Sequence, residues 1–333
     1  MIAMGDIRDA IQGQIHRLVG FGEGGVDLTR PAGDDGLFGP ASTAWRVHSD
    51  FTAMMAGGVA ALLLQMLHPG ALAGVWDHSN FRRDMLGRLR RTAQFISGTT
   101  YGSTATAEGL IARVRAIHDR VAGTLPDGTP YSANDPALLT WVHVAEVTMF
   151  LAAYRRYRDP DMSAAEQDRY LAEVAIIAER LGATCVPRSR AAVEAYFRAI
   201  RPQLRADHRT REVARALLRQ RPASAAMAPA QALMLEGGIA LLPEWAKAMH
   251  RLERPPIHRP VVRAGMAGVA SVLRWALTTG RRSGRGHNDS LILPARGEVA
   301  GRRPDGGTST QRSACGYPPP PAALVPLPAS GED

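Results

Sequence analysis

Lysine is almost absent from this chain of 333 residues, which contains a single one, Lys247. Arginine supplies the rest of the 40 basic residues, and the formal net charge is +9. This bias is typical of the codon usage of a GC-rich genome, and no nucleic-acid recognition motif accompanies the charge. We therefore expect no nucleic acid as a partner, and keep a basic, nucleic-acid-associated helical protein only as an alternative.

Common catalytic and metal-binding motifs are absent as well. No H-E-x-x-H, P-loop, G-x-S-x-G or dinucleotide fingerprint occurs in the sequence. Cys185 and Cys315 form no Cys-x-x-Cys pair, which argues against a thiolate metal site. Because no C-x-x-C-H motif occurs either, the usual covalent attachment of a c-type haem is excluded.

No secretory signal is visible, because no basic region followed by an apolar stretch occurs near the N-terminus, and we expect a cytoplasmic location. The longest apolar run, residues 51–67, reaches only the lower limit for a membrane span and contains two glycines and a glutamine. We interpret it as a buried central helix. No integral membrane span is therefore expected, and peripheral membrane contact is left open.

Helical patterns alternate with short turn signals from residue 45 to about residue 280, and no convincing hairpin is visible. Asp135 before Pro136 predicts the start of one helix. Ser163 with Glu166 predicts a capping box on the next helix, which Gly182 ends. The sequence therefore predicts an all-α fold.

Composition divides the chain into three segments. Residues 1–44 read as a short helix and a Gly/Asp/Pro-rich lead-in, and residues 45–280 as the helical domain. Residues 281–333 are rich in proline, glycine, arginine and serine and offer no periodic apolar face. We predict that this last segment is a disordered tail.

Three segments combine polar residues with apolar helical faces. In the first, Arg88, Arg91 and Thr92 lie at positions i, i+3 and i+4 and share one face of a helix. Two arginines and a hydroxyl on one face favour a site for an anionic group. A solvated basic face with the leucines turned inward is the alternative, and spacing does not decide between them.

The second segment, RVRAIHDRV at 113–121, places His118 on an apolar helical stripe with Arg115 one turn earlier. The stripe, which we expect to be buried, comprises Leu110, Ile111, Val114, Ile117 and Val121. Gly123 is predicted to end this helix, just before the turn PDGTP. This pattern fits a His118 that ligates a metal. It also fits a His118 whose ring nitrogens are hydrogen-bonded within the protein core.

The third segment carries His143, with Glu146 three residues later on the same helical face. A carboxylate at this spacing is able to orient a ligating histidine or simply to satisfy a buried one. His143 is therefore a second candidate ligand.

The order of four motifs adds information that spacing does not contain. They are LLLQMLHPGALAGVWDHS (62–79), GRLRRTAQF (87–95), RVRAIHDRVAG (113–123) and PYSANDPALLTWVH (130–143). Their succession resembles the MpaB-type oxygenases, which include the latex clearing proteins (rubber oxygenases) and fungal enzymes that cleave a prenyl chain in mycophenolic acid biosynthesis. The resemblance covers roughly residues 40–220.

This resemblance implies a globin-like helical core that holds one non-covalent haem b, with dioxygen as co-substrate. The family's proximal Arg-x-x-His motif matches Arg115 and His118, which makes His118 the axial ligand of the haem iron and His143 a lower-ranked alternative. The family's distal motif of an arginine, a basic residue and a threonine also has a counterpart. The implied roles are cofactor binding for His118, Arg115 and Arg88, and catalysis for Arg91 and Thr92.

One position departs from the rubber enzymes, which carry a lysine where this chain has Arg91. A guanidinium is not deprotonated in proteins and does not ligate iron as that lysine can. We therefore expect an open or water-occupied distal site in which Arg91 donates hydrogen bonds. The expected function is a haem b-dependent oxygenase acting on an apolar, isoprenoid- or polyketide-like small molecule. A haem- or lipid-binding carrier without turnover is the alternative.

Overall fold

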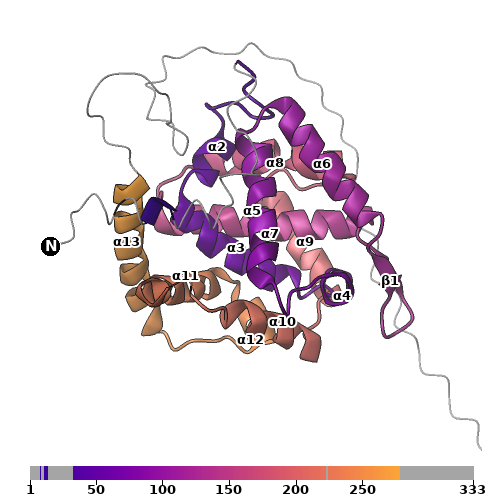
Figure 1. Cartoon of the computed structure of the whole chain (residues 1–333). Coiled ribbons are helices and arrows are strands. Elements are labelled where there is room, and N and C mark those ends of the chain that lie inside the picture. Colours follow the sequence, from indigo (N-terminus) through magenta and orange to yellow (C-terminus); the bar gives the residue numbers. More distant parts are fainter. Residues whose placement is uncertain (1–7, 9–10, 14–32, 223, 278–333) are drawn as a thin grey trace, which may run out of the picture.

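The computed structural model describes residues 8, 11–13, 33–222 and 224–277, and this part of the chain is mainly helical (Figure 1). Most of the segment 1–44 and the whole predicted tail 281–333 lie outside the described residues. The α-helices are α2 Thr43–His48, α3 Phe51–Gln65, α4 Pro69–His78, α5 Met85–Tyr101, α6 Thr104–His118, α7 Pro136–Tyr157, α8 Ala164–Leu181, α9 Arg190–Ile200, α10 His208–Leu218, α11 Ala228–Leu241, α12 Glu244–His250 and α13 His258–Leu277. Two short 3-10 helices, η1 Arg201–Gln203 and η2 Ala225–Met227, and two strands, β1 Ala122–Thr124 and β2 Pro130–Ser132, complete the described elements.

The centre of the fold is the antiparallel pair α3 and α7. A Cβ atom on Gly57 would lie 2.9 Å from a ring carbon of Phe150, so the absence of a side chain allows the two helices to approach closely. At the other end of the pair, the Trp141 indole donates to the Gln65 carbonyl at 3.1 Å, and the Gln65 amide donates to the Val142 carbonyl at 3.1 Å. The predicted buried central helix at 51–67 is thus confirmed as α3.

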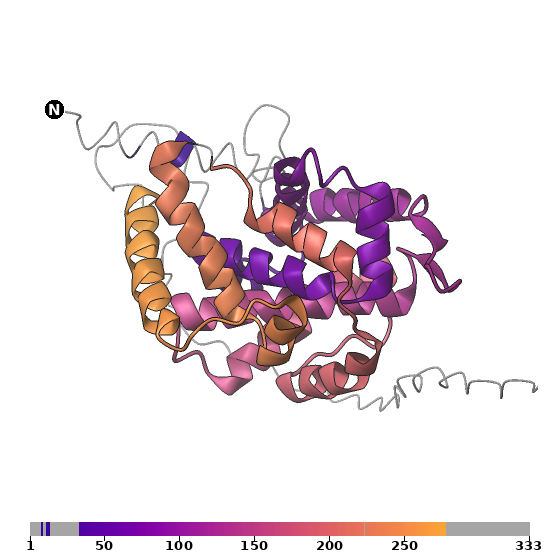
Figure 2. The ribbon, with the colours of Figure 1, turned by 90° about the horizontal axis from the view of Figure 1, so that it is seen from below.

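Other helices cover this pair on two sides (Figures 1 and 2). Helices α2 and α8 pack on α7, and α5 packs on α2 and α6. On the other side α11 crosses α3, and α13 packs on α11, α3 and α7 at the edge of the molecule. The candidate residues on α5 and α6 therefore lie on the opposite side of the core from α13.

The local helix signals are confirmed. Asp135 accepts a hydrogen bond from the backbone N–H of Leu138 at 2.9 Å and caps α7, with Pro136 at its first position. Ser163 and Glu166 form the reciprocal capping box of α8. Gly182 ends α8 at φ 109°, a conformation that glycine adopts without strain.

The interpretation of Gly123 as a helix end is wrong. Helix α6 ends at His118, and Gly123 lies in β1, where it pairs with Tyr131 of the antiparallel β2. A Cβ atom at Gly123 would lie 2.9 Å from the Tyr131 ring, so glycine is needed here for close approach. The expected turn is confirmed as the loop of this hairpin, with Gly128 at φ 86°, but the hairpin itself was not expected.

The predicted apolar stripe of α6 is only partly buried. Ala107 and Ile111 are buried, whereas Ile117 is 44% exposed. Because the buried residues of α6 lie in its first two turns, the last turn, which carries His118, is less covered than the periodicity predicts.

Helix α7 is long and apolar enough to cross a membrane by length and composition. Two bent pairs, α3 with α4 and η2–α11 with α12, pass the same test as broken spans among the described residues. In the fold, 72% of the α7 window is buried inside the protein. Packing against neighbouring helices therefore accounts for most of its apolar surface.

Candidate functional site

Arg88 is a half-buried cation on the first turns of α5. Its guanidinium donates to the Ser79 hydroxyl at 3.3 Å, and none of the described carboxylates forms an ion pair with it. Burial lowers the pKa of Arg88 to about 10, and the nearby Arg91 acts in the same direction. A guanidinium in such surroundings is stabilised by any anion that reaches it. Arg88 therefore keeps a charge that an anionic partner would stabilise.

Arg91 and Thr92 are exposed, unlike the half-buried Arg88 on the same helix. The Arg91 side chain is 64% exposed and lies 3.6 Å from a carboxylate oxygen of Asp84, the residue that caps α5. The Thr92 hydroxyl donates to the Arg88 carbonyl at 3.2 Å, one turn earlier. Their catalytic role stays a prediction, because in this conformation both side chains are satisfied locally.

His118 lies at the last position of α6, a helix that contacts α5. Its Nδ1 is buried and has no hydrogen-bond partner. Burial lowers the pKa of His118, opposed by the neighbouring Asp119, so the imidazole is neutral at physiological pH. A neutral imidazole is the form that ligates a metal.

Arg115 does not share the surroundings of His118. Its side chain is exposed, and its guanidinium donates to the Arg180 carbonyl at the end of α8, at 3.2 Å. The structure therefore shows Arg115 linking α6 to α8. Its role in cofactor binding stays a prediction.

His143 lies on α7 and is buried, and its Nε2 is also without a partner. Burial lowers its pKa to about 4. No hydrogen bond joins it to Glu146 in the described structure, so neither of the two roles that the spacing allows Glu146 is seen here. Burial raises the pKa of Glu146 to about 7 instead, since no described cation compensates its charge. His118 and His143 therefore both keep an unsatisfied ring nitrogen.

The sequence reading missed a buried polar cluster that joins α2, α5 and α8. His48 lies 2.8 Å from the Thr100 hydroxyl through Nδ1 and 2.9 Å from the Tyr170 hydroxyl through Nε2. Burial lowers the pKa of His48 to about 3. These residues are far apart in the sequence, and no local pattern connects them. Both ring nitrogens of His48 are used, so it is a structural histidine.

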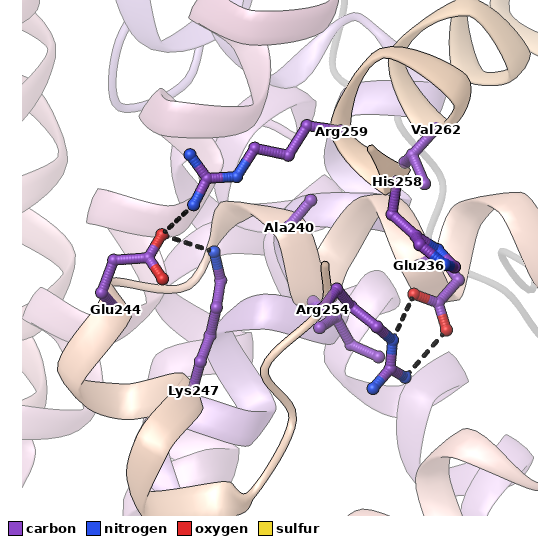
Figure 3. Close-up of a pocket in the computed structure, with 9 residues that line it drawn as sticks. Glu236, Ala240, Glu244, Lys247, Arg254, His258, Arg259 and Val262 are labelled. Carbon is purple, nitrogen blue, oxygen red and sulfur yellow. Dashed lines mark hydrogen bonds and ion pairs between the residues drawn. The ribbon is translucent and has the colours of Figure 1, made fainter. Parts of the chain in front are cut away.

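A separate charged pocket lies between α11, α12 and α13 (Figure 3). Glu244 accepts from Arg259 at 2.8 Å and from Lys247, the only lysine of the chain, at 3.1 Å. Arg254 binds both carboxylate oxygens of Glu236, at 3.1 and 3.0 Å. None of the predicted site residues lines this pocket, and its cations are paired. We interpret it as an ionic contact that joins the three helices.

Comparison with known proteins identifies the family of this chain. Residues 45–275 match the family described as ER-bound oxygenase mpaB/B'/rubber oxygenase, catalytic domain. The match covers well over half of the chain, and the protein belongs to this oxygenase family. No curated protein and no solved structure matches it. All of the candidate residues lie inside the matched range.

The residues present fit a haem, judged from their unsatisfied groups. Within the described residues, no group of three or more histidine, cysteine, aspartate or glutamate side chains is placed to hold a bare metal ion. A haem needs one neutral imidazole from the protein and cations for its propionates. His118 offers the imidazole, and Arg88 offers a buried cation without a carboxylate partner.

Proposed function

We propose that this protein is a haem b-dependent oxygenase that acts, with dioxygen, on an apolar small molecule of isoprenoid or polyketide type. The family supports the oxygenase part of this proposal. One observation carries the haem part: an unsatisfied imidazole on α6 and an unpaired guanidinium on α5, two helices that contact each other. A bound cofactor would supply the metal and the negative charge that the imidazole and the guanidinium lack as partners.

When bound, haem b supplies an iron that binds and activates dioxygen. In the proposed site, His118 would hold the haem iron, because burial lowers its pKa and favours the neutral ring. His143 is the lower-ranked alternative, since its Nε2 is equally free but no Arg-x-x-His motif precedes it. Arg88 binds a propionate through its unused donors.

Arg91 and Thr92 would hold and orient the dioxygen and the substrate that enter the site. A guanidinium has five N–H donors and no acceptor, so Arg91 acts as a hydrogen-bond donor. Thr92 provides a hydroxyl one residue further along α5. An apolar substrate matches the half-buried apolar side chains of the same helix, Leu89, Phe95 and Ile96.

The visible spectrum of the full chain, purified from haem-supplemented cells, tests the proposal. We expect a Soret band and one haem b per chain, removable by acid–acetone extraction. His118→Ala should lose the haem or shift its spectrum, whereas the matched His143→Ala variant should keep the haem and lower thermal stability. A folded, colourless wild-type protein would overturn the proposal, and loss of haem from the His143 variant alone would reverse the ligand assignment.

Turnover is tested by dioxygen consumption with prenylated alkenes. An oxygen-dependent product is expected from the wild-type protein and should be absent from His118→Ala. A protein that binds haem and these alkenes but forms no oxygenated product would instead be a carrier.

A further inference from the structure

The outer face of α13 carries large apolar side chains in contact with solvent. Five such side chains are strongly exposed in the described part of the chain, and four of them lie on α13 or directly before it. Ile257 is 74% exposed, Val261 65%, Val272 52% and Trp275 36%. Exposed apolar side chains gathered in one place, unlike scattered ones, mark an interaction surface.

These side chains share one side of the helix. Val261, Val272 and Trp275 follow a helical spacing of three and four residues, with the exposed Ala264 and Gly268 between them. The opposite face is buried, where Val262, Met266 and Leu273 pack towards the core. Helix α13 therefore has a second apolar face that folding of the described chain does not use.

Positive charge lies beside this face. Helix α13 contains three arginines and no acidic residue, and two of these arginines, Arg259 and Arg274, pair with Glu244 and Asp50 of other elements. Arg263 is exposed and forms no ion pair among the described residues. Arg8 adds a further cation, with its guanidinium 4.9 Å from the centre of the Trp275 ring.

We propose that the outer face of α13 docks on an anionic lipid bilayer, with the helix lying in the plane of the interface. An apolar face of this kind enters the boundary between headgroups and acyl chains, and arginines at its margin bind anionic headgroups. A second copy of the chain fits less well, because pairing two such faces brings together the Arg263 side chains of both copies, and α13 has no acidic residue to compensate them.

The proposed docking face is remote from the proposed haem site. Helix α13 lies at one edge of the molecule, and α6 with the β1–β2 hairpin lies at the other (Figures 1 and 2). Variants of α13 should therefore keep the Soret band of the wild-type protein. Failure of membrane docking and failure of haem binding are thus separate results.

Sedimentation of the full-length protein with phosphatidylcholine vesicles, with and without phosphatidylglycerol, tests the proposal. We expect binding only to the vesicles that contain phosphatidylglycerol, weakened by added salt. Val261→Asp combined with Val272→Asp should lower the partition coefficient by about tenfold or more, because both burial and charge attraction are lost. Arg263→Ala should lower it by about fivefold, since one cation contributes about that factor near an anionic surface.

The matched control places the same two charges on α9. Ala191→Asp with Ala199→Asp, at exposed positions of that helix, should bind vesicles nearly as the wild type does. Absence of vesicle binding, or equal loss in both double variants, would overturn the proposal. So would light scattering that shows a dimer which only the α13 variant dissociates, because the face would then be an interface between two copies.

Discussion

Helices α3 and α7 meet through small and apolar residues, whereas the neighbouring helices α5 and α6 carry the arginines, the threonine and the histidine of the candidate site. In the first pair Gly57 lets the Phe150 ring approach, and the polar atoms of Gln65 and Trp141 find partners across the interface. In the second pair Arg88 and His118 retain groups without partners.

This difference separates the residues that stabilise the fold from those available for chemistry. A satisfied apolar contact lowers the free energy of the folded chain and has no remaining capacity to bind. An unsatisfied buried polar group lowers stability until a ligand supplies its partner. Arg88 and His118 on α5 and α6, and His143 on α7, are therefore the groups that a bound cofactor would stabilise.

The largest effect is expected on the α5 side. Arg91→Ala should retain haem but lower turnover by about a hundred- to a thousandfold, the cost of removing a polarising donor once bound substrate has displaced water from the exposed Arg91 side chain. Arg83→Ala, at an exposed position just before α5, is the control and should leave turnover unchanged. Equal rates in both variants would mean that Arg91 belongs to a solvated basic face.

Arg88→Ala should act on the cofactor instead of the rate. Loss of the half-buried guanidinium removes the proposed partner of a propionate, so haem occupancy after gel filtration should fall while the apo-protein stays folded. Titration of the apo-protein with haem measures the change in affinity. An unchanged affinity would assign Arg88 a purely structural role.

The close packing of α3 and α7 predicts opposite outcomes for two glycine substitutions. Gly57→Ala places a Cβ atom 3.1 Å from the Met149 carbonyl oxygen and should lower the free energy of unfolding by about 1–3 kcal/mol. Gly109→Ala, in α6, meets no atom within 4 Å and should raise it by about 0.5–1 kcal/mol. Chemical denaturation measures both, and a stabilising Gly57→Ala would show that the pair is less tightly packed.

Glu146 is the single acidic residue of helix α7, and it predicts a pH-dependent effect. Its pKa is raised from 4.5 to about 7, so folding favours the protonated form. The contribution of protonated Glu146 to the free energy of unfolding is complete below pH 4.5. It is lost as the pH rises through about 7. Glu146→Gln should therefore raise the free energy of unfolding at pH 8 by about 2–3 kcal/mol, and by much less at pH 4.5.

Thermal denaturation at the two pH values measures this effect. Glu194→Gln, on an exposed position of α9, is the control and should change stability little at either pH. A Glu146→Gln variant that loses stability at pH 8 would show that the carboxylate is charged and compensated in the folded protein.

The smallest effect is expected at the start of α7. Asp135→Ala removes the hydrogen bond to the Leu138 N–H and should lower the free energy of unfolding by about 1 kcal/mol. Asp161→Ala, at an exposed position before α8, is the matched control and should change it by less than about 0.5 kcal/mol. Equal effects would mean that Pro136 alone is sufficient to start the helix.

Features made by neighbouring residues could be predicted from the sequence. The cap at Asp135, the capping box of Ser163 and Glu166, and the glycine end at Gly182 depend on hydrogen bonds and dihedral angles within a few residues. The buried helix at 51–67 was also predictable, because a run of apolar residues has few alternatives to burial. The identity of the candidate ligands came from ordered motifs and not from periodicity, which left His118 and His143 open.

Tertiary structure decided the features that join distant residues. The β1–β2 hairpin was missed because its strands have three residues each, too few for an alternating pattern. His48 became a structural histidine through Thr100 and Tyr170, and Arg88 has no ion pair because the described part of the fold brings no carboxylate to it. The sequence by itself determined which residues form helices and where these helices begin. Which polar groups find partners was decided by three-dimensional packing, because a hydrogen bond depends on distance in space and not on separation along the chain.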